Sequence, residues 1–107
     1  MSTAYTIVLC SCPDSVTASS IAGYLVSNKL AACVNVVPNV LSIYTWQGNT
    51  EQADEQILVI KTKADSYNDV QRAILEIHPY ELPEIISVPI DTGLPTYLNW
   101  IDENVLP

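Results

Sequence analysis

The sequence is poor in basic side chains and in glycine, and it contains no phenylalanine. Only four Lys and Arg residues stand against twelve Asp and Glu residues, so the formal net charge of the 107-residue chain is −8. This charge repels phosphate backbones and anionic lipid, which argues against nucleic acid and membrane surfaces as partners. The three glycines are scattered, so the glycine-rich loops that hold nucleotide phosphates are missing as well.

Groups for catalysis are equally scarce. His78 is the only histidine, and no Gly-x-Ser-x-Gly sequence supplies a serine nucleophile, so a hydrolase triad is not favoured. The sole arginine, Arg72, lies within a predicted helix and not in a phosphate-binding loop. We therefore expect a protein that is not an enzyme.

No apolar run approaches the ~18 residues of a membrane span, and the segment 1–12 lacks the basic start of a secretory signal. These absences predict a cytoplasmic protein. Three cysteines are an odd number, so we expect free thiols and not a disulfide framework at Cys10, Cys12 and Cys33.

Apolar residues, in contrast, are plentiful. At 49% hydrophobic and 15% charged, the chain can bury a core and is expected to form one domain over residues 1–107. The apolar share is high for so short a chain, which predicts that part of the surface contacts further copies of the same chain.

Alternating and helical hydrophobic patterns follow one another along the chain. The predicted elements are a strand over 5–12, a helix over 16–28, a strand over 33–46, a strand over 55–63, a helix over 66–77, a strand over 85–90 and a short helix from Pro95. This order is the split βαβ pattern of a ferredoxin-like α+β fold with an antiparallel sheet.

Several residues predict how these elements begin and bend. Asp14 is expected to cap the first helix, and Ser66 with Asp69 resembles a capping box for the second. Pro38 cannot donate to a ladder, which predicts a bulge or an edge position in the long strand. The turn over 47–50 then connects this strand to the next one as a bent hairpin. The apolar positions expected on the inner side of the first helix are Val16, Ile21, Leu25 and Val26.

In such a sheet the helices cover one face, and the other face must contact water or a neighbour. The hairpin is apolar on both sides, at Val40, Leu41, Ile43, Tyr44 and Trp46. We therefore interpret this face and the hairpin as a subunit interface.

Cysteine and histidine together suggest a metal site. Cys10 and Cys12 point to the same side of one strand, about 7 Å apart along it, and thiolate with imidazole suits copper or zinc. Two structural interpretations remain beside this one. The cysteines can be small core residues, and His78 can close the second helix by interacting with its last carbonyls.

Lys61 follows the four apolar residues 57–60, and a half-buried lysine needs a carboxylate partner. The candidates are Glu55, Glu81 and Glu84. This pairing allows two interpretations. One is an ion pair at a subunit interface, and the other is a polar and aromatic cluster at a cleft, made of Lys61, Trp46, Tyr80 and Glu84. The acidic group Glu51, Asp54 and Glu55 is expected to be a solvated rim.

Four segments in this order resemble the CutA family of divalent-cation-tolerance proteins over nearly the whole chain: "KLAACVNVVPNVLSIYTWQG", "EQILVIKTK", "HPYELPEIISVPI" and "YLNWI". The resemblance implies a ferredoxin-like subunit in a compact homotrimer, with an architecture similar to that of the PII nitrogen-signalling proteins. It also implies contacts between subunits through the long hairpin.

The resemblance further implies a metal site. In some members, copper binding is attributed to a cysteine at the end of the first strand and to a pair of histidines before Pro-Tyr. Cys10 and His78 match this pattern, whereas the first histidine is Ile77 here. The expected ligands are thus Cys10 and His78, and the expected ion is copper, as Cu(I) or Cu(II), or another divalent cation.

Residues shared with the family are expected to frame a cleft between subunits: Trp46, Glu55, Lys61, Tyr80, Glu81, Glu84 and Trp100. The preferred interpretation is a metal-tolerance protein. Two alternatives stay open, namely a PII-like sensor that binds a small metabolite in this cleft and a scaffold for a protein partner.

Overall fold

Four strands and three helices follow one another in the predicted order. A computed structural model describes residues 4–107, so the first three residues of the expected domain lie outside the described chain. The elements are β1 (Tyr5–Cys12), α1 (Ser15–Ser27), β2 (Cys33–Trp46), β3 (Asn49–Lys63), the 3₁₀ turn η1 (Ala64–Ser66), α2 (Tyr67–Ile77), β4 (Ile85–Pro89) and α3 (Pro95–Glu103).

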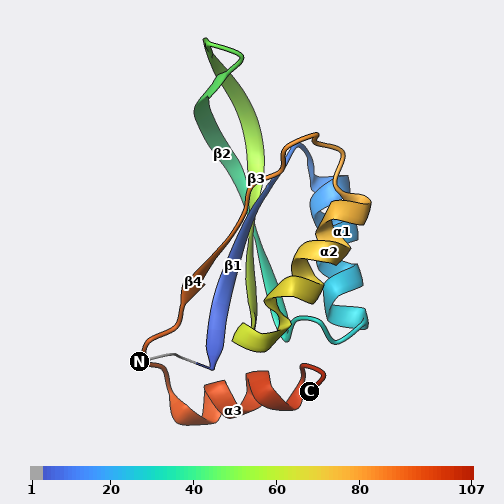
Figure 1. The fold of residues 1–107 in the computed structure, drawn as a ribbon, viewed down its shortest axis with the longest axis vertical. Coiled ribbons are helices and arrows are strands. Elements are labelled where there is room, and N and C mark those ends of the chain that lie inside the picture. The colour runs from blue at the N-terminus through green and yellow to red at the C-terminus, as the bar shows by residue number, and fades with distance from the viewer. Residues whose placement is uncertain (1–3) are drawn as a thin grey trace.

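The strands form one antiparallel sheet in the order β2-β3-β1-β4. In β1, Leu9 lies opposite Val59 of β3 and Ile86 of β4, so β1 is paired on both sides. Helices α1 and α2 lie on the same face of the sheet, and α3 crosses its lower end (Figure 1). The predicted ferredoxin-like α+β fold is therefore confirmed. Pro89 lies on the edge strand β4, where a residue without an N–H is tolerated.

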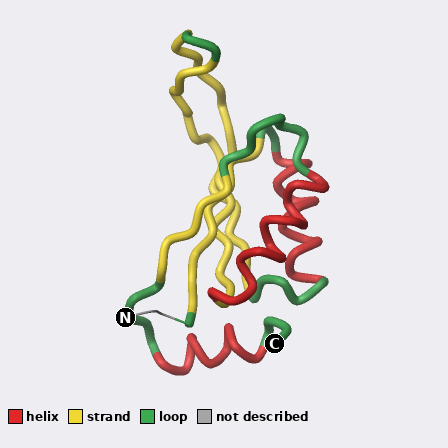
Figure 2. Tube along the Cα trace, in the orientation of Figure 1, coloured by secondary structure: helices red, strands yellow, loops and turns green. Residues whose placement is uncertain are grey.

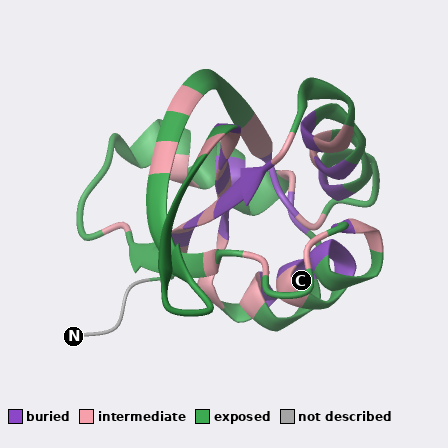
Figure 3. Cartoon of the chain, turned by 90° about the horizontal axis from the view of Figure 1, so that it is seen from above, coloured by how far each residue is buried: buried purple, intermediate pink, exposed green. Residues whose placement is uncertain are grey.

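The core lies between the sheet and the two helices. Every second strand residue faces the helices, as Val8 and Cys10 do in β1 and Leu58 and Ile60 do in β3, and all four are fully buried. The helical residues packed against them are Ala18, Ile21, Leu25, Val70, Ala73 and Ile74. Figure 3 shows these buried faces in purple, whereas the projecting hairpin is green and pink.

Fewer of the apolar residues of α1 are buried than predicted. Ile21 and Leu25 are buried, but Val16 is 78% exposed and Val26 is also exposed. Val16 lies in the first turn, five residues before Ile21, and its position faces away from the sheet. The prediction for these two valines is wrong because each lies five residues from Ile21, which is about 140° around a helix of 3.6 residues per turn, so neither shares the face that Ile21 and Leu25 bury.

A second, smaller core lies under α3. Ile101 and Val105 pack with Ala32, and the partly buried Leu98 adds to this cluster. Trp100 instead lies on the outer side, 40% exposed, with its ring 5.5 Å from that of Tyr97.

The hairpin of β2 and β3 projects far beyond the helices (Figure 2). Gln47 and Gly48 form its turn with φ of 49° and 81°, the two positive φ angles that tight hairpin turns require. The expected bulge lies between Val37 and Val40, where Asn39 also has a positive φ. However, β3 begins at Asn49 and not near residue 55, because ladder hydrogen bonds are made by the backbone and accept polar side chains such as Glu51.

One of the two predicted helix caps is present. The carboxylate of Asp14 accepts the N–H of Thr17 at 2.7 Å, and this bond lowers the pKa of Asp14. Ser66 makes no side-chain bond to the start of α2, so the capping-box prediction is wrong. The physical reason is that η1 leads directly into α2, which holds Ser66 in a helical conformation (φ −90°, ψ −3°) and not in the extended conformation of an N-cap.

Two substitutions on α1 test the position of the core. We expect Leu25→Ala to lower the free energy of unfolding by about 2–5 kcal/mol, because it leaves a cavity beneath the helix. The control Val16→Ala removes an exposed side chain and should change it by less than about 0.5 kcal/mol. Urea unfolding followed by circular dichroism measures both, and equal effects would contradict this assignment of the core.

Candidate functional site

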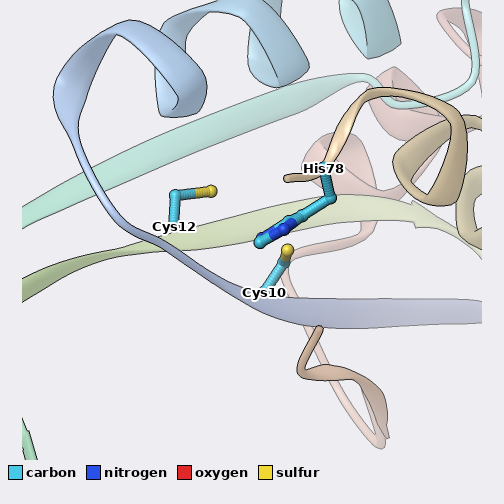
Figure 4. Close-up of side chains that lie close together, drawn as sticks. All are labelled: Cys10, Cys12 and His78. Carbon is cyan, nitrogen blue, oxygen red and sulfur yellow. The ribbon is translucent and has the colours of Figure 1, made fainter. Parts of the chain in front are cut away.

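Cys10, Cys12 and His78 come together at one end of the sheet. One possible ligand atom from each lies within 4.8 Å of the others, and all three residues are buried. Strand alternation puts both cysteines on the helix side of β1, and His78 directly follows the last residue of α2. Figure 4 shows the imidazole ring beside the sulfur of Cys10, with Cys12 pointing toward them.

The imidazole of His78 is held by two backbone hydrogen bonds. The N–H of Tyr80 donates to Nδ1 at 3.1 Å, so Nδ1 carries no proton. In the neutral ring Nε2 then carries the proton and donates it to the carbonyl oxygen of Ser11 at 2.6 Å. The expectation that His78 interacts with the last carbonyls of α2 holds only for its backbone, whose N–H donates to Ile74.

The two thiols influence each other. A hydrogen bond with Cys12, together with burial, raises the pKa of Cys10 far above its usual range. The same hydrogen bond lowers the pKa of Cys12.

This set of donors suits a soft metal ion. Ligand atoms around one ion, with bonds of about 2.0–2.3 Å, lie about 3–4.5 Å apart, close to the spacing of the three side chains. Two sulfurs and one imidazole nitrogen favour copper or zinc over magnesium or calcium. The predicted ligand pair lacks Cys12, although its spacing from Cys10 already puts it on the same side of the strand. Ile77 stands where some family members have a histidine and offers no ligand atom. The sulfur of Cys12 lies where it can take the place of that ligand.

Cys33 lies apart from this cluster. It is in β2 on the opposite face of the sheet, where its sulfur is 3.9 Å from the Nζ of Lys61. It is only partly buried.

A cavity of about 620 Å³ lies between the hairpin and the loop after His78. Its lining contains five of the seven residues predicted for the cleft. They are Trp46, Glu55, Tyr80, Glu81 and Glu84, joined by Ser11, Ser42, Ile43, Tyr44, Thr45, Leu82 and Pro83. Ser11 reaches the cavity because strand alternation turns it away from the side of Cys10 and Cys12.

Glu55 is the most buried carboxylate of this lining, with 7% of the residue exposed. Its Oε2 accepts the hydroxyl of Tyr80 at 2.6 Å. Burial first, and then the Glu55 carboxylate, raise the pKa of Tyr80. The expected solvated rim is therefore wrong for Glu55, because the loop of Tyr80 folds over it, but right for the exposed Glu51 and Asp54.

Lys61 and Trp100 do not reach this cavity. The Nζ of Lys61 donates to Asn35 of the neighbouring strand β2. Among residues 4–107 the ion pairs are Lys63–Asp102 and Arg72–Asp69, so within one chain Lys61 does not gain the expected carboxylate partner. The reason is strand register, which places Lys61 opposite Cys33 and six residues along β3 from Glu55. Trp100 lies on α3, at the other end of the sheet.

The antiparallel order β2-β3-β1-β4, the projecting hairpin and the thiol–imidazole cluster define a small ferredoxin-like protein with a candidate soft-metal site. The profile of the CutA1 divalent ion tolerance protein family matches residues 6–104. The chain therefore belongs to this family, as its sequence resemblance predicts.

Similarity to individual CutA proteins from distant organisms supports the same assignment. The chain is 45% identical over 94 residues to the Protein CutA homolog of Xenopus laevis; the match covers 88% of this chain but only 62% of that relative. It is 41% identical over 98 residues to the divalent-cation tolerance protein CutA of Thermus thermophilus, covering 92% of this chain and 95% of the relative. The solved structure of the divalent cation tolerance protein from the same bacterium matches with a TM-score of 0.93 and 40% identity, over 94% of this chain and 98% of that chain.

The cytoplasmic location stays a prediction. A CutA structure from Archaeoglobus fulgidus, 35% identical with a TM-score of 0.93 over 95% of this chain and 99% of that chain, is described as periplasmic. Within the described part of this chain, no helix is both long and apolar enough to cross a bilayer.

The bond between Tyr80 and Glu55 gives a direct test of the cavity wall. We expect Tyr80→Phe to lower the free energy of unfolding by about 1.5–3 kcal/mol, because a buried carboxylate loses its hydrogen-bond donor. The control Tyr24→Phe removes an exposed hydroxyl that bonds to none of the described residues, and it should have almost no effect. Urea unfolding at one fixed protein concentration compares the two, and similar values for both would contradict the importance of this bond.

Proposed function

We propose that this chain is a non-enzymatic divalent-metal tolerance protein that holds copper between Cys10, Cys12 and His78. The observation that carries the proposal is the approach of all three donor atoms to within 4.8 Å of one another in a buried site. Membership of the CutA1 divalent ion tolerance family supports it independently.

The cluster favours Cu(I) over Cu(II). Thiolate sulfur is a soft ligand, and softness selects the monovalent ion. Cysteine binds a metal as thiolate, so Cys10 and Cys12 would both give up their protons when copper enters the cluster.

Equilibrium dialysis with Cu(I) under anaerobic conditions, and separately with Cu(II), tests the site. We expect one Cu(I) per chain, and an affinity lowered at least ~10-fold in each of Cys10→Ser, Cys12→Ser and His78→Ala. Cys33→Ser is the matched control, because its sulfur lies on the other face of the sheet. Circular dichroism confirms that each variant is folded. Copper binding that none of the three substitutions weakens would contradict the proposal.

The functional unit that we propose is a homotrimer. No helix or strand within residues 4–107 covers the sheet face opposite the helices, and the edge of this face carries Ile86 and Val88, each about half exposed. Further apolar side chains are exposed along the hairpin, at Val37, Leu41, Ile43, Tyr44 and Trp46. So continuous an apolar surface favours burial against other copies, and the trimer is the assembly that the family resemblance implies.

Sedimentation velocity measures this assembly. We expect a species of three times the 11.7-kDa mass of one chain, and its dissociation in Ile86→Glu, because a carboxylate would be buried without a partner. Leu75→Glu is the control, since Leu75 is similarly exposed but lies on α2, on the other side of the sheet. A monomeric wild-type protein would overturn the proposal.

The cavity beside Glu55 supports a second function, the binding of a small molecule as in a PII-like sensor. Its volume of about 620 Å³ lies within the range of ligand sites, about 300–1,000 Å³.

A further inference from the structure

We propose that the cavity beside Glu55 binds a small organic cation with a primary ammonium or guanidinium group on an alkyl chain. The inference rests on the second function above and names the chemical class of its ligand. The cavity is bounded by the hairpin residues 42–46 on one side and by the loop residues 80–84 on the other.

The lining carries negative charge without compensation. Glu55, Glu81 and Glu84 contribute three carboxylates, and the lining contains no lysine, arginine or histidine. The ion pairs within residues 4–107 involve none of these three glutamates. A cavity with three acidic groups, in a chain of net charge −8, attracts cations and repels anions.

Glu55 is the specific anchor. The residue is more than nine-tenths buried, and only its Oε2 accepts a hydrogen bond, from Tyr80. The other carboxylate oxygen, Oε1, receives none from the described residues. No buried side-chain oxygen of the described residues is sealed off without a partner, so Oε1 is open to the cavity that Glu55 lines. An N–H donor from a bound cation would complete the bonding of this buried charge.

The aromatic walls distinguish an organic cation from a hydrated metal ion. Tyr44, Trp46 and Tyr80 line the cavity, and the faces of aromatic rings attract ammonium and guanidinium groups. Ile43 and Leu82 add apolar surface that an alkyl chain can cover. A small hydrated ion would gain nothing from this surface, and a purely apolar ligand would leave Glu55 without a counter-ion.

The test is isothermal titration calorimetry of the assembled wild-type protein with three compounds of similar length. Agmatine carries an ammonium and a guanidinium group, 1,4-butanediol is neutral, and succinate is anionic. We expect saturable binding of agmatine alone, weakened at least ~10-fold in Glu55→Gln and in Glu84→Gln. Glu51→Gln is the matched control, because it removes the same charge from an exposed position on β3 outside the lining.

The possible outcomes distinguish a wrong ligand class from the absence of any small-molecule function. Binding of butanediol or succinate as strong as that of agmatine would overturn the cationic class and leave a small-molecule site standing. A different result, in which none of the compounds binds and Glu55→Gln only lowers the trimer fraction in sedimentation, would mean that a neighbouring subunit fills the cavity. That result would overturn both the cation and the small-molecule function. Agmatine binding unchanged in Glu55→Gln would place the site elsewhere and overturn the inference.

Discussion

The hydrogen bond between the His78 ring and the carbonyl oxygen of Ser11 joins the thiol–imidazole cluster to the wall of the cavity beside Glu55. At 2.6 Å it joins the residue after α2 to the end of β1, and the opposite ring nitrogen receives the N–H of Tyr80. The imidazole therefore lies beside the thiols of β1, and the loop that follows it carries Tyr80 to Glu55. Without this ring, neither the cluster nor the cavity wall would have its present shape.

Strand alternation turns neighbouring residues at the end of β1 toward opposite faces of the sheet, and the surroundings on the two faces differ chemically. Cys10 and Cys12 face the helices, where thiols and an imidazole form a dry, soft donor set. Ser11, between them, faces an acidic and aromatic cavity. If a ring nitrogen of His78 ligates a metal, as proposed, it gives up the hydrogen bond it now makes, and a contact of Ser11 or Tyr80 would change with it. The cluster and the cavity are thus physically connected through one side chain.

The sequence predicts the architecture better than it predicts the sites. Hydrophobic periodicity and the order of elements lead to the correct fold, and Pro38 marks the bulge. The prediction fails for Val16 because a residue five positions from Ile21 lies on another side of the helix. The burial of Glu55 is decided by a loop 25 residues away, which no local pattern reports. The position of Cys12 in the cluster is predictable from the sequence, because a spacing of two residues from Cys10 puts both on one strand face.

The buried thiol–imidazole cluster is the proposed metal site, and its ligands can be observed directly. X-ray absorption spectroscopy at the copper edge, on the protein loaded with one Cu(I) per chain, addresses the ligands themselves. We expect sulfur scatterers from Cys10 and Cys12 together with the multiple-scattering pattern of one imidazole, and the loss of that pattern in His78→Ala. A copper ion surrounded only by oxygen and nitrogen would contradict the claim, since both cysteines would then be ordinary core residues.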